Sequence, residues 1–287
     1  MNSELVALCA SIAFALFAVY GWLGLRVSTP LTATLVSLAA RTLTLGVALV
    51  FAGGIPAFAA RALWIFILLG VMQTVISLLT FIGLQKIGTS RSQPLRNSYP
   101  LWSAMIAIAL MGERAGLAIL FGTFLVVVGV VMISWKPETA APSYRWWHVL
   151  FSTLAGLLAG IAFPLRRYGL TITNAPVFFS FVVAIVSLLG TLPYTLWTRG
   201  DRNLKWHAKG VWYFFLSGFF EALGALLTLV ALTTGRVVIV SPIVATTPLF
   251  SLIISLIFLR GKEKITMITI LGTVAVVAGT IAIALGR

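Results

Sequence analysis

The sequence predicts an all-α integral membrane protein with ten transmembrane helices, arranged as two inverted repeats of five. The first observation is composition: the 287 residues are 60% hydrophobic and 9% charged, with a mean hydropathy of +1.09. A soluble domain of this size would lack the polar surface to cover itself, so the solvent is lipid. The second is a duplication, in which residue landmarks of the first half return 148 positions later.

Ten apolar stretches account for the helices. A span of about 20 apolar residues crosses a hydrocarbon core of roughly 30 Å as a helix, which satisfies its own backbone hydrogen bonds. The expected spans cover residues 4–25, 32–52, 62–85, 91–111, 115–135, 147–168, 176–197, 211–233, 237–259 and 265–285. The first span has no basic segment before it and no obvious cleavage site, so we expect a retained helix instead of a signal peptide.

The duplication rests on proline, glycine and rare polar positions, for which chance matches are uncommon. Gly70, Gln73, Pro94 and Pro100 recur 148 positions later as Gly218, Glu221, Pro242 and Pro248. We therefore expect a first repeat at residues 1–140 and a second at 141–287. Because each repeat has an odd number of helices, the second enters the membrane from the opposite side, as in many secondary transporters that bind substrate near the midplane.

The charge distribution predicts topology. The net charge is +14, but the basic residues lie in short loops and form no patch or motif typical of nucleic-acid binding. Odd-numbered loops carry 13 of them, Arg96 included, and the other side carries 6, including Arg166 and Arg167. The bias places the odd-numbered loops in the cytoplasm and both termini outside a bacterial-type inner membrane.

Rare residue types argue against a metal site or an enzyme. Cys9 is the single cysteine, and His148 and His207 are far apart in sequence, so no zinc site of His and Cys is expected. The six acidic residues are scattered, which leaves no cluster for catalysis. We expect no cofactor, no metal and no enzymatic activity.

Several of these landmarks resemble a known family. The run Pro100-Leu101-Trp102-Ser103, the Gly112-Glu113 pair that ends the fourth span and Gly122 in the fifth have a second copy between Pro248 and Gly279. They resemble the EamA repeat of the drug/metabolite transporter (DMT) superfamily, over nearly the whole chain. Within that superfamily, the chain is most similar to bacterial aromatic and neutral amino-acid exporters. In the second half, Lys262 interrupts the Gly-Glu pair.

The resemblance implies a central cavity lined by helices 1, 3, 4, 6, 8 and 9, which takes a small-molecule substrate by alternating access. The residues that we expect to contact substrate are Phe17, Gln73, Ser77, Asn97, Tyr99, Trp102, Phe163 and Glu221. Aromatic side chains would supply an apolar pocket for a neutral or aromatic amino acid, although lipid contact or core packing is the commoner fate of a membrane aromatic.

Two ionisable residues lie deep inside expected spans, where a charge is costly and faces a cavity or a partner. They are Arg41 and Glu221. Glu221 replaces the neutral Gln73 of the first repeat, as expected if one copy gained a contact for a substrate amine or a proton site. The alternative is that Arg41 only neutralises Glu221.

Prolines predict bends in several spans, because proline removes a backbone donor and frees carbonyl groups for a ligand. The expected bends are at Pro94, Pro100, Pro164, Pro242 and Pro248. A kink that only serves packing is the alternative for any one of them. Small residues such as Gly122, Gly129, Gly272 and Gly279 let helices approach closely, which serves internal packing or a homodimer equally well.

These observations predict an inner-membrane exporter of small metabolites, with neutral or aromatic amino acids as the expected substrates. Proton antiport through Glu221 and facilitated diffusion are equally compatible with the sequence. A carrier of anionic metabolites such as nucleotide sugars is the alternative transporter, with charge supplied by Arg41, Arg96 and Arg166. A channel or a structural membrane protein is the alternative outside that class.

Overall fold

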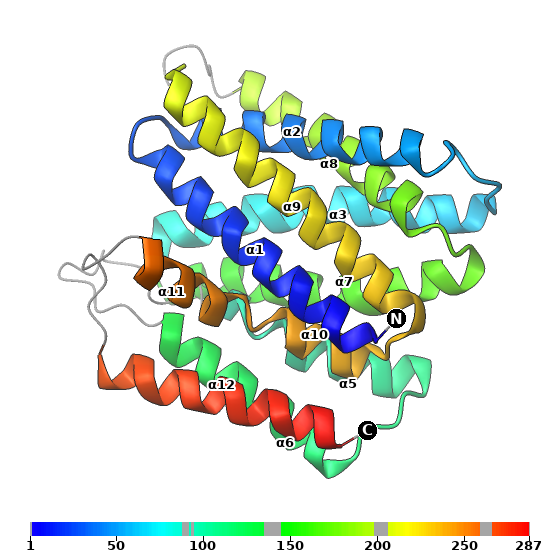
Figure 1. The fold of residues 1–287 in the computed structure, drawn as a ribbon, viewed down its shortest axis with the longest axis vertical. Coiled ribbons are helices and arrows are strands. Elements are labelled where there is room, and N and C mark those ends of the chain that lie inside the picture. Colours follow the sequence, from blue (N-terminus) through cyan, green and yellow to red (C-terminus); the bar gives the residue numbers. More distant parts are fainter. Residues whose placement is uncertain are drawn as a thin grey trace. The chain divides into compact units, whose positions relative to one another are not determined.

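The computed structural model is helical throughout the residues that it describes, which are 2–87, 92, 95–134, 145–197, 206–258 and 266–286. The α-helices are α1 (Ser3–Leu25), α2 (Pro30–Phe51), α3 (Ala60–Ile87), α5 (Tyr99–Met111), α6 (Leu117–Ser134), α7 (Val149–Ile172), α8 (Pro176–Trp197), α9 (Ala208–Thr234), α10 (Val237–Val244), α11 (Thr247–Phe258) and α12 (Met267–Leu285) (Figure 1). A 3₁₀ turn, Trp146–His148, precedes α7.

The helices confirm the expected all-α membrane fold. Among the described residues, seven apolar stretches are long enough to cross a membrane, and three shorter apolar helices, Tyr99–Met111, Leu117–Ile133 and Met267–Ile283, correspond to the other expected spans. The fourth and ninth spans are not continuous helices, because turns at 97–98 and 245–246 interrupt them. These turns are 148 positions apart, so both repeats break at the same place.

Two compact units make up the chain, and each contains segments from both halves of the sequence. Unit 1 comprises Met1–Thr74 and Tyr168–Thr233, and unit 2 comprises Val75–Arg167 and Thr234–Arg287. Compactness thus divides the chain differently from the repeat boundary expected near residue 140.

In unit 1, the two repeats use equivalent phenylalanines in the same way. Phe66 and Phe214, which are 148 positions apart, are both fully buried. The Phe66 ring packs against Gly169, and the Phe214 ring packs against Gly24, at distances that leave no room for a Cβ on either glycine. Each repeat therefore places an aromatic ring from its third helix on a glycine of the other repeat.

The equivalent glycines Gly70 and Gly218 also pack each repeat against the other in unit 1. A Cβ on Gly70 would lie 2.6 Å from the Cβ of Val186 in α8, and a Cβ on Gly218 would clash with the carbonyl oxygen of Ser37 in α2. The third helix of one repeat thus packs on the second helix of the other, in both directions.

A seam of four glycines joins α6 and α12 in unit 2, where the two helices lie side by side (Figure 1). Gly122 faces Gly279 and Gly129 faces Gly272, so the helices run antiparallel with backbones in close contact. Gly272 and Gly279 are themselves the copies of Gly122 and Gly129, 150 positions later. Two equivalent helices that pair in opposite directions are what an inverted repeat requires. Of the two expected uses of these glycines, the structure shows the internal packing of α6 against α12.

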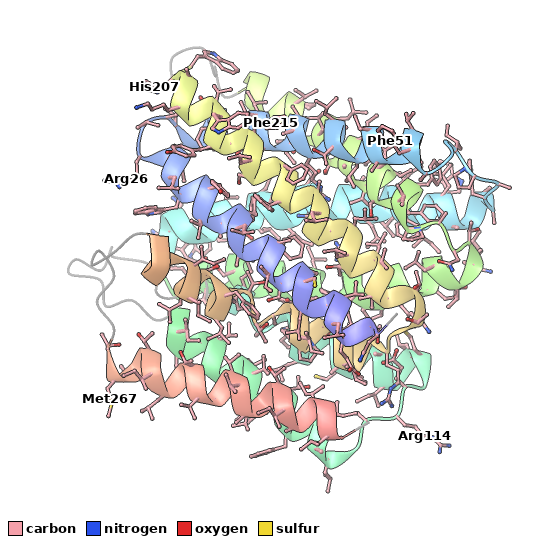
Figure 2. The ribbon with its side chains drawn as sticks, viewed as in Figure 1. Arg26, Phe51, Arg114, His207, Phe215 and Met267 are labelled. Atoms are coloured by element: carbon pink, nitrogen blue, oxygen red, sulfur yellow. The ribbon has the colours of Figure 1, made fainter. Side chains whose placement is uncertain are left out.

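In unit 1, α1 and α9 also run antiparallel, as contacts at Gly24–Phe214 and Phe14–Gly224 show. Figure 2 accordingly shows Arg26, just after α1, and His207, just before α9, at the same end of this helix pair.

Candidate functional site

The fourth span changes direction at a turn that a side chain stabilises. Ser98 donates its hydroxyl to the carbonyl oxygen of Leu95 at 2.7 Å, and the indole Nε1 of Trp102 donates to the same hydroxyl at 3.2 Å. Pro100 follows directly and has no N–H to give to the carbonyl of Arg96. The turn therefore lacks the backbone hydrogen bond that a residue other than proline would make at this position, and it lies next to the aromatic side chains of Tyr99 and Trp102.

The ninth span repeats this local structure. Thr246, the copy of Ser98, donates its hydroxyl to Ile243 at 2.7 Å, and Ile243 is the copy of Leu95. In the sequence of this second turn, Ser241-Pro242 to Thr247-Pro248, the polar side chains are hydroxyls, because Ala245 stands where the first repeat has Asn97. The two turns share a hydrogen bond from a hydroxyl group to the carbonyl three residues earlier, but the turn near Tyr99 carries the larger polar and aromatic side chains.

A small-residue step on α7 brings this helix directly onto the fourth span in unit 2. A Cβ on Gly156 would lie 2.8 Å from the carbonyl oxygen of Leu95, and a Cβ on Gly160 would lie 2.5 Å from the Cβ of Trp102. Residues 156, 160 and 163 lie on one helical face, because spacings of four and three residues return to the same side. Close approach at the glycines therefore sets Phe163 against the fourth span.

Phe163, Tyr99 and two arginines form the cluster at this contact, which we call the aromatic–arginine cluster (Arg96, Tyr99, Phe163 and Arg166). The Tyr99 and Phe163 rings stack with centroids 5.4 Å apart and an interplanar angle of 10°. The Arg166 guanidinium lies 5.5 Å from the centroid of the Phe163 ring, in cation–π range. Arg96 lies three residues before Tyr99 in the fourth span. The stacked rings, with the Arg166 guanidinium over one of them, thus lie where α7 packs on the fourth span in unit 2.

A buried ion pair lies in unit 1. The Arg41 Nη1 atom, on α2, is 2.8 Å from the Glu221 Oε1 atom, on α9, and the two side chains are 5% and 17% exposed. The Arg41 Nε atom is buried and has no hydrogen-bond partner among the described residues. The pair compensates the charge of both residues inside the apolar bundle, where a lone carboxylate would be costly.

The structure divides the other expected contact residues between the units. Phe17 and Gln73 belong to unit 1, and Ser77, Asn97 and Trp102 belong to unit 2. The Phe17 carbonyl accepts a hydrogen bond from the Ser217 hydroxyl at 2.9 Å, which ties α1 to α9. Asn97 lies in the turn of the fourth span.

The expected bends have distinct positions. Pro100 lies in the first turn of α5, Pro164 and Pro242 lie inside α7 and α10, and Pro248 is the second residue of α11. Pro94 lies outside the described residues.

An open groove of about 470 Å³ runs between α2 and α8 in unit 1. Its lining is Ala39, Thr42, Leu43, Gly46, Val47, Val50, Phe181 and Leu188. None of the expected contact residues lines this groove, and its apolar walls suit contact with lipid chains.

Sequence reasoning missed the role of Glu113 in unit 2. Its two carboxylate oxygens accept hydrogen bonds from the backbone N–H groups of Val237 and Val238, at 2.9 and 3.0 Å. Beside it, the Arg236 guanidinium donates to the carbonyl of Arg114 at 2.9 Å. The loop after α5 therefore caps the positive N-terminus of α10 with a carboxylate. The Gly-Glu motif marked the residue, but nothing in the sequence indicated its partner.

The loop count of basic residues needs a correction. It assigned Arg96 to a loop on one side of the membrane and Arg166 and Arg167 to the other, but the last two lie inside α7, and the backbone of Arg96 packs against Gly156 of the same helix. None of the three reports on loop charge. Without them, the count changes from 13 against 6 to 12 against 4, and the direction of the bias stays.

The comparisons with known proteins assign the chain to a family. The profile of the EamA-like transporter family matches residues 1–135 and 146–285. The chain belongs to the EamA-like transporter family. As a member of the DMT superfamily, it is a multi-pass membrane transporter with a small-molecule substrate.

A solved structure, described only as "Crystal structure of protein", shares the fold of this EamA-like transporter. It superposes with a TM-score of 0.80 at 14% sequence identity, over 99% of this chain and 96% of the other. At that identity the likeness shows the fold alone. A search of curated proteins found no match.

Proposed function

We propose that this transporter exports neutral or aromatic amino acids from the cytoplasm, by rocking its two inverted halves around a substrate held near the midplane. The observation that carries the proposal is the stack of Tyr99 on Phe163 beside the Arg166 guanidinium, next to a broken helix. An aromatic wall suits an apolar side chain, and the arginine suits a carboxylate. In unit 2, Asn97 and Trp102 belong to the same proposed substrate path as this stack, and Phe17, Gln73 and Glu221 of unit 1 are proposed as further contact residues.

Exchange in liposomes that hold the purified protein tests the proposal. We expect saturable counterflow of labelled neutral or aromatic amino acids, which Trp102→Ala weakens because the indole lies at the turn of the fourth span. Phe124→Ala, on the exposed face of α6, is the matched aromatic control. An absence of exchange with every amino acid in the panel contradicts the proposal.

A second candidate substrate class is an anionic metabolite, such as a nucleotide sugar. It is favoured by one observation, that the Arg166 guanidinium lies 5.5 Å from the centroid of the Phe163 ring, which stacks on Tyr99. Arg41 supports it less, because Glu221 already compensates its charge. Competition by such anions against amino-acid exchange, lost on arginine-to-glutamine change, would identify this class. Steady ion conductance in planar bilayers would instead indicate a channel.

Energy coupling depends on Glu221 in the antiport version of the proposal. If this carboxylate exchanges a proton during the cycle, Glu221→Gln abolishes the dependence of export on a pH gradient while exchange at equal pH continues. Unchanged gradient dependence in that variant excludes Glu221 as the proton site, and an absence of gradient dependence in the wild type indicates facilitated diffusion.

We propose that the protein lies in a bacterial-type inner membrane with both termini on the outer side. The bias of 12 basic residues against 4 supports this orientation. Fusions of alkaline phosphatase and of a fluorescent protein to the C-terminus test it, because the phosphatase is active only outside and the fluorescent protein only inside. A fluorescent fusion with an inactive phosphatase fusion would reverse the orientation.

A further inference from the structure

We propose that Glu221 binds the ammonium group of the substrate, and that Arg41 is a positioning residue that holds the Glu221 carboxylate for it. This inference rests on the proposed export of amino acids and names the group that recognises their amine. The observation that carries it is the buried ion pair of unit 1, which leaves hydrogen-bonding capacity on both partners. The subsite uses no residue of the aromatic–arginine cluster.

The two repeats make the same contact between helices, so the ion pair can be compared with its equivalent. A Cβ on Gly218 of α9 would lie 2.8 Å from the Cβ of Ala40 in α2. A Cβ on the equivalent Gly70 of α3 would lie 2.6 Å from the Cβ of Val186 in α8. Ala40 and Val186 are therefore equivalent, and α8 repeats α2 with an offset of 146 positions.

The equivalent of the ion pair is uncharged. Ser187 of α8 stands where α2 has Arg41, and Gln73 of α3 stands where α9 has Glu221. Beside Gln73, the Thr74 hydroxyl donates to the carbonyl oxygen of Ser187 at 3.4 Å. This contact is thus made without an ion pair. Desolvation offsets the attraction between two buried charges, so a buried pair is weak evidence for a stabilising role. The charges therefore serve a role other than packing.

The ion pair uses only part of the hydrogen-bonding capacity of each partner. Arg41 Nη1 lies 2.8 Å from Glu221 Oε1, and Arg41 Nε is buried without a partner among the described residues. Within the same part of the chain, no hydrogen bond reaches Glu221 Oε2. The Glu221 side chain is 17% exposed and the Arg41 side chain only 5%. The group that a ligand can reach is therefore the carboxylate, which favours a cation.

An ammonium group fits this carboxylate. A carboxylate accepts hydrogen bonds at both oxygens, so Glu221 can keep Arg41 at Oε1 and bind a second cation at Oε2. Ammonium supplies three N–H donors and a positive charge, which makes the hydrogen bond roughly twice as strong as one between neutral groups. Arg41 compensates the carboxylate between transport events, when a lone charge in an apolar bundle would be costly. The subsite therefore suits a substrate with an amine and repels an anion that has none.

Phenyllactate tests the amine in the wild type, because it differs from phenylalanine only by a hydroxyl group in place of the amine. In proteoliposomes that exchange labelled phenylalanine, both compounds compete as unlabelled ligands. We expect phenyllactate to compete at least about tenfold more weakly than phenylalanine, because it loses a charge-assisted hydrogen bond.

The variant Glu221→Gln keeps the size of the side chain and removes its charge. We expect it to exchange phenylalanine at high concentration, with a KM raised about tenfold or more and kcat less affected. The inhibition constant of phenyllactate should stay unchanged, so the preference for the amine is lost. A merely structural role of the ion pair would instead weaken both compounds by the same factor.

Variants of Arg41 test its positioning role. Arg41→Lys should keep most of the preference, because the lysine ammonium still pairs with Glu221. Where Arg41→Gln does not fold, the double variant Arg41→Gln with Glu221→Gln carries the test, since no buried charge remains. It should show the raised KM of Glu221→Gln. Glu113→Gln in unit 2 is the matched control and should leave the KM unchanged, because that carboxylate caps α10.

Equal competition by phenylalanine and phenyllactate in the wild type overturns the inference while export of amino acids stands. So does a preference for the amine that persists in Glu221→Gln, or a loss shared equally by both compounds. Failure of the proposed function has a different signature, which is that no amino acid exchanges. In that case thermal unfolding in detergent still tests the subsite, because phenylalanine should stabilise the wild type and not Glu221→Gln. Equal stabilisation of the two proteins, or none of either, then overturns the inference as well.

Discussion

Gly122 and Gly279 face each other in unit 2 so closely that a Cβ on either would lie 2.6 Å from the carbonyl oxygen of the other. Such reciprocity is a property of two equivalent helices around a two-fold axis. It also means that neither position has room for a side chain.

Gly279→Leu is therefore expected to destabilise the protein by about 1–3 kcal/mol or more, since overpacking forces the helix backbones apart. Ala278→Leu adds the same side chain to the neighbouring exposed position of α12 and should leave stability unchanged. Thermal unfolding in detergent, followed by size-exclusion chromatography, measures the difference. Equal melting temperatures for the two variants would contradict the prediction, because they would show that α6 and α12 can move apart without loss of stability.

Because Arg41 and Glu221 form an ion pair, we expect the effects of substituting them on stability to be strongly non-additive. Arg41→Gln leaves the Glu221 carboxylate in an apolar bundle, and loss of one partner of a buried pair typically costs about 3–5 kcal/mol. The double variant Arg41→Gln with Glu221→Gln should recover most of that loss, because no charge remains. Additive effects of the two changes in melting temperature would contradict the coupling. Arg26→Gln, at the exposed end of α1, is the control.

We expect substitutions of Glu113 to reduce stability in graded steps, because its carboxylate caps the N-terminus of α10. Loss of a capping side chain costs about 0.5–2 kcal/mol, so Glu113→Ala should show the full loss. Glu113→Gln keeps the length and one acceptor oxygen, and is expected to lie between alanine and wild type. Hydrogen exchange at the Val237 and Val238 amides reports the cap directly, since both N–H groups bond to Glu113. Unchanged protection in the alanine variant would show that water or another group replaces the carboxylate.

We expect the Phe163 ring to give the transporter a preference for substrates with aromatic side chains. Aromatic pairs contribute about 0.5–1.5 kcal/mol beyond burial, which corresponds to roughly a two- to tenfold change in affinity. Phe163→Ala should raise the KM for aromatic amino acids by that factor, whereas Phe163→Tyr retains the ring and should not. Counterflow with labelled phenylalanine and alanine compares the two classes. An equal effect on both substrates would assign Phe163 to packing instead of side-chain recognition.

Sequence reasoning found the helices because lipid imposes a simple requirement on every span. The expected spans 4–25, 176–197 and 265–285 differ by only a few residues from α1, α8 and α12. Apolar length alone was enough there. It was not enough for the fourth and ninth spans, where the turns at 97–98 and 245–246 are held by hydroxyl groups that bond to the carbonyl three residues earlier, beside the backbone N–H of the same residue.

Pairing between distant residues was harder to predict. The depth of Arg41 and Glu221 was evident from sequence, since ionisable groups in apolar spans are rare. The contact of Phe163 with Tyr99 was not, because only the close packing of α7 on the fourth span at Gly156 and Gly160 brings these two rings together.

The exchange of segments between the halves also sets an order for biosynthesis. Each compact unit contains segments from both halves of the sequence. The glycines of α6 can pack against those of α12 only after α12, the last helix, has been synthesised. The first repeat is therefore inserted into the bilayer before the helices of the second repeat, against which it packs most closely, have been synthesised. Fragments cut near residue 140 would each lack half of both units, yet when produced in the same cell they hold every surface needed to reassemble.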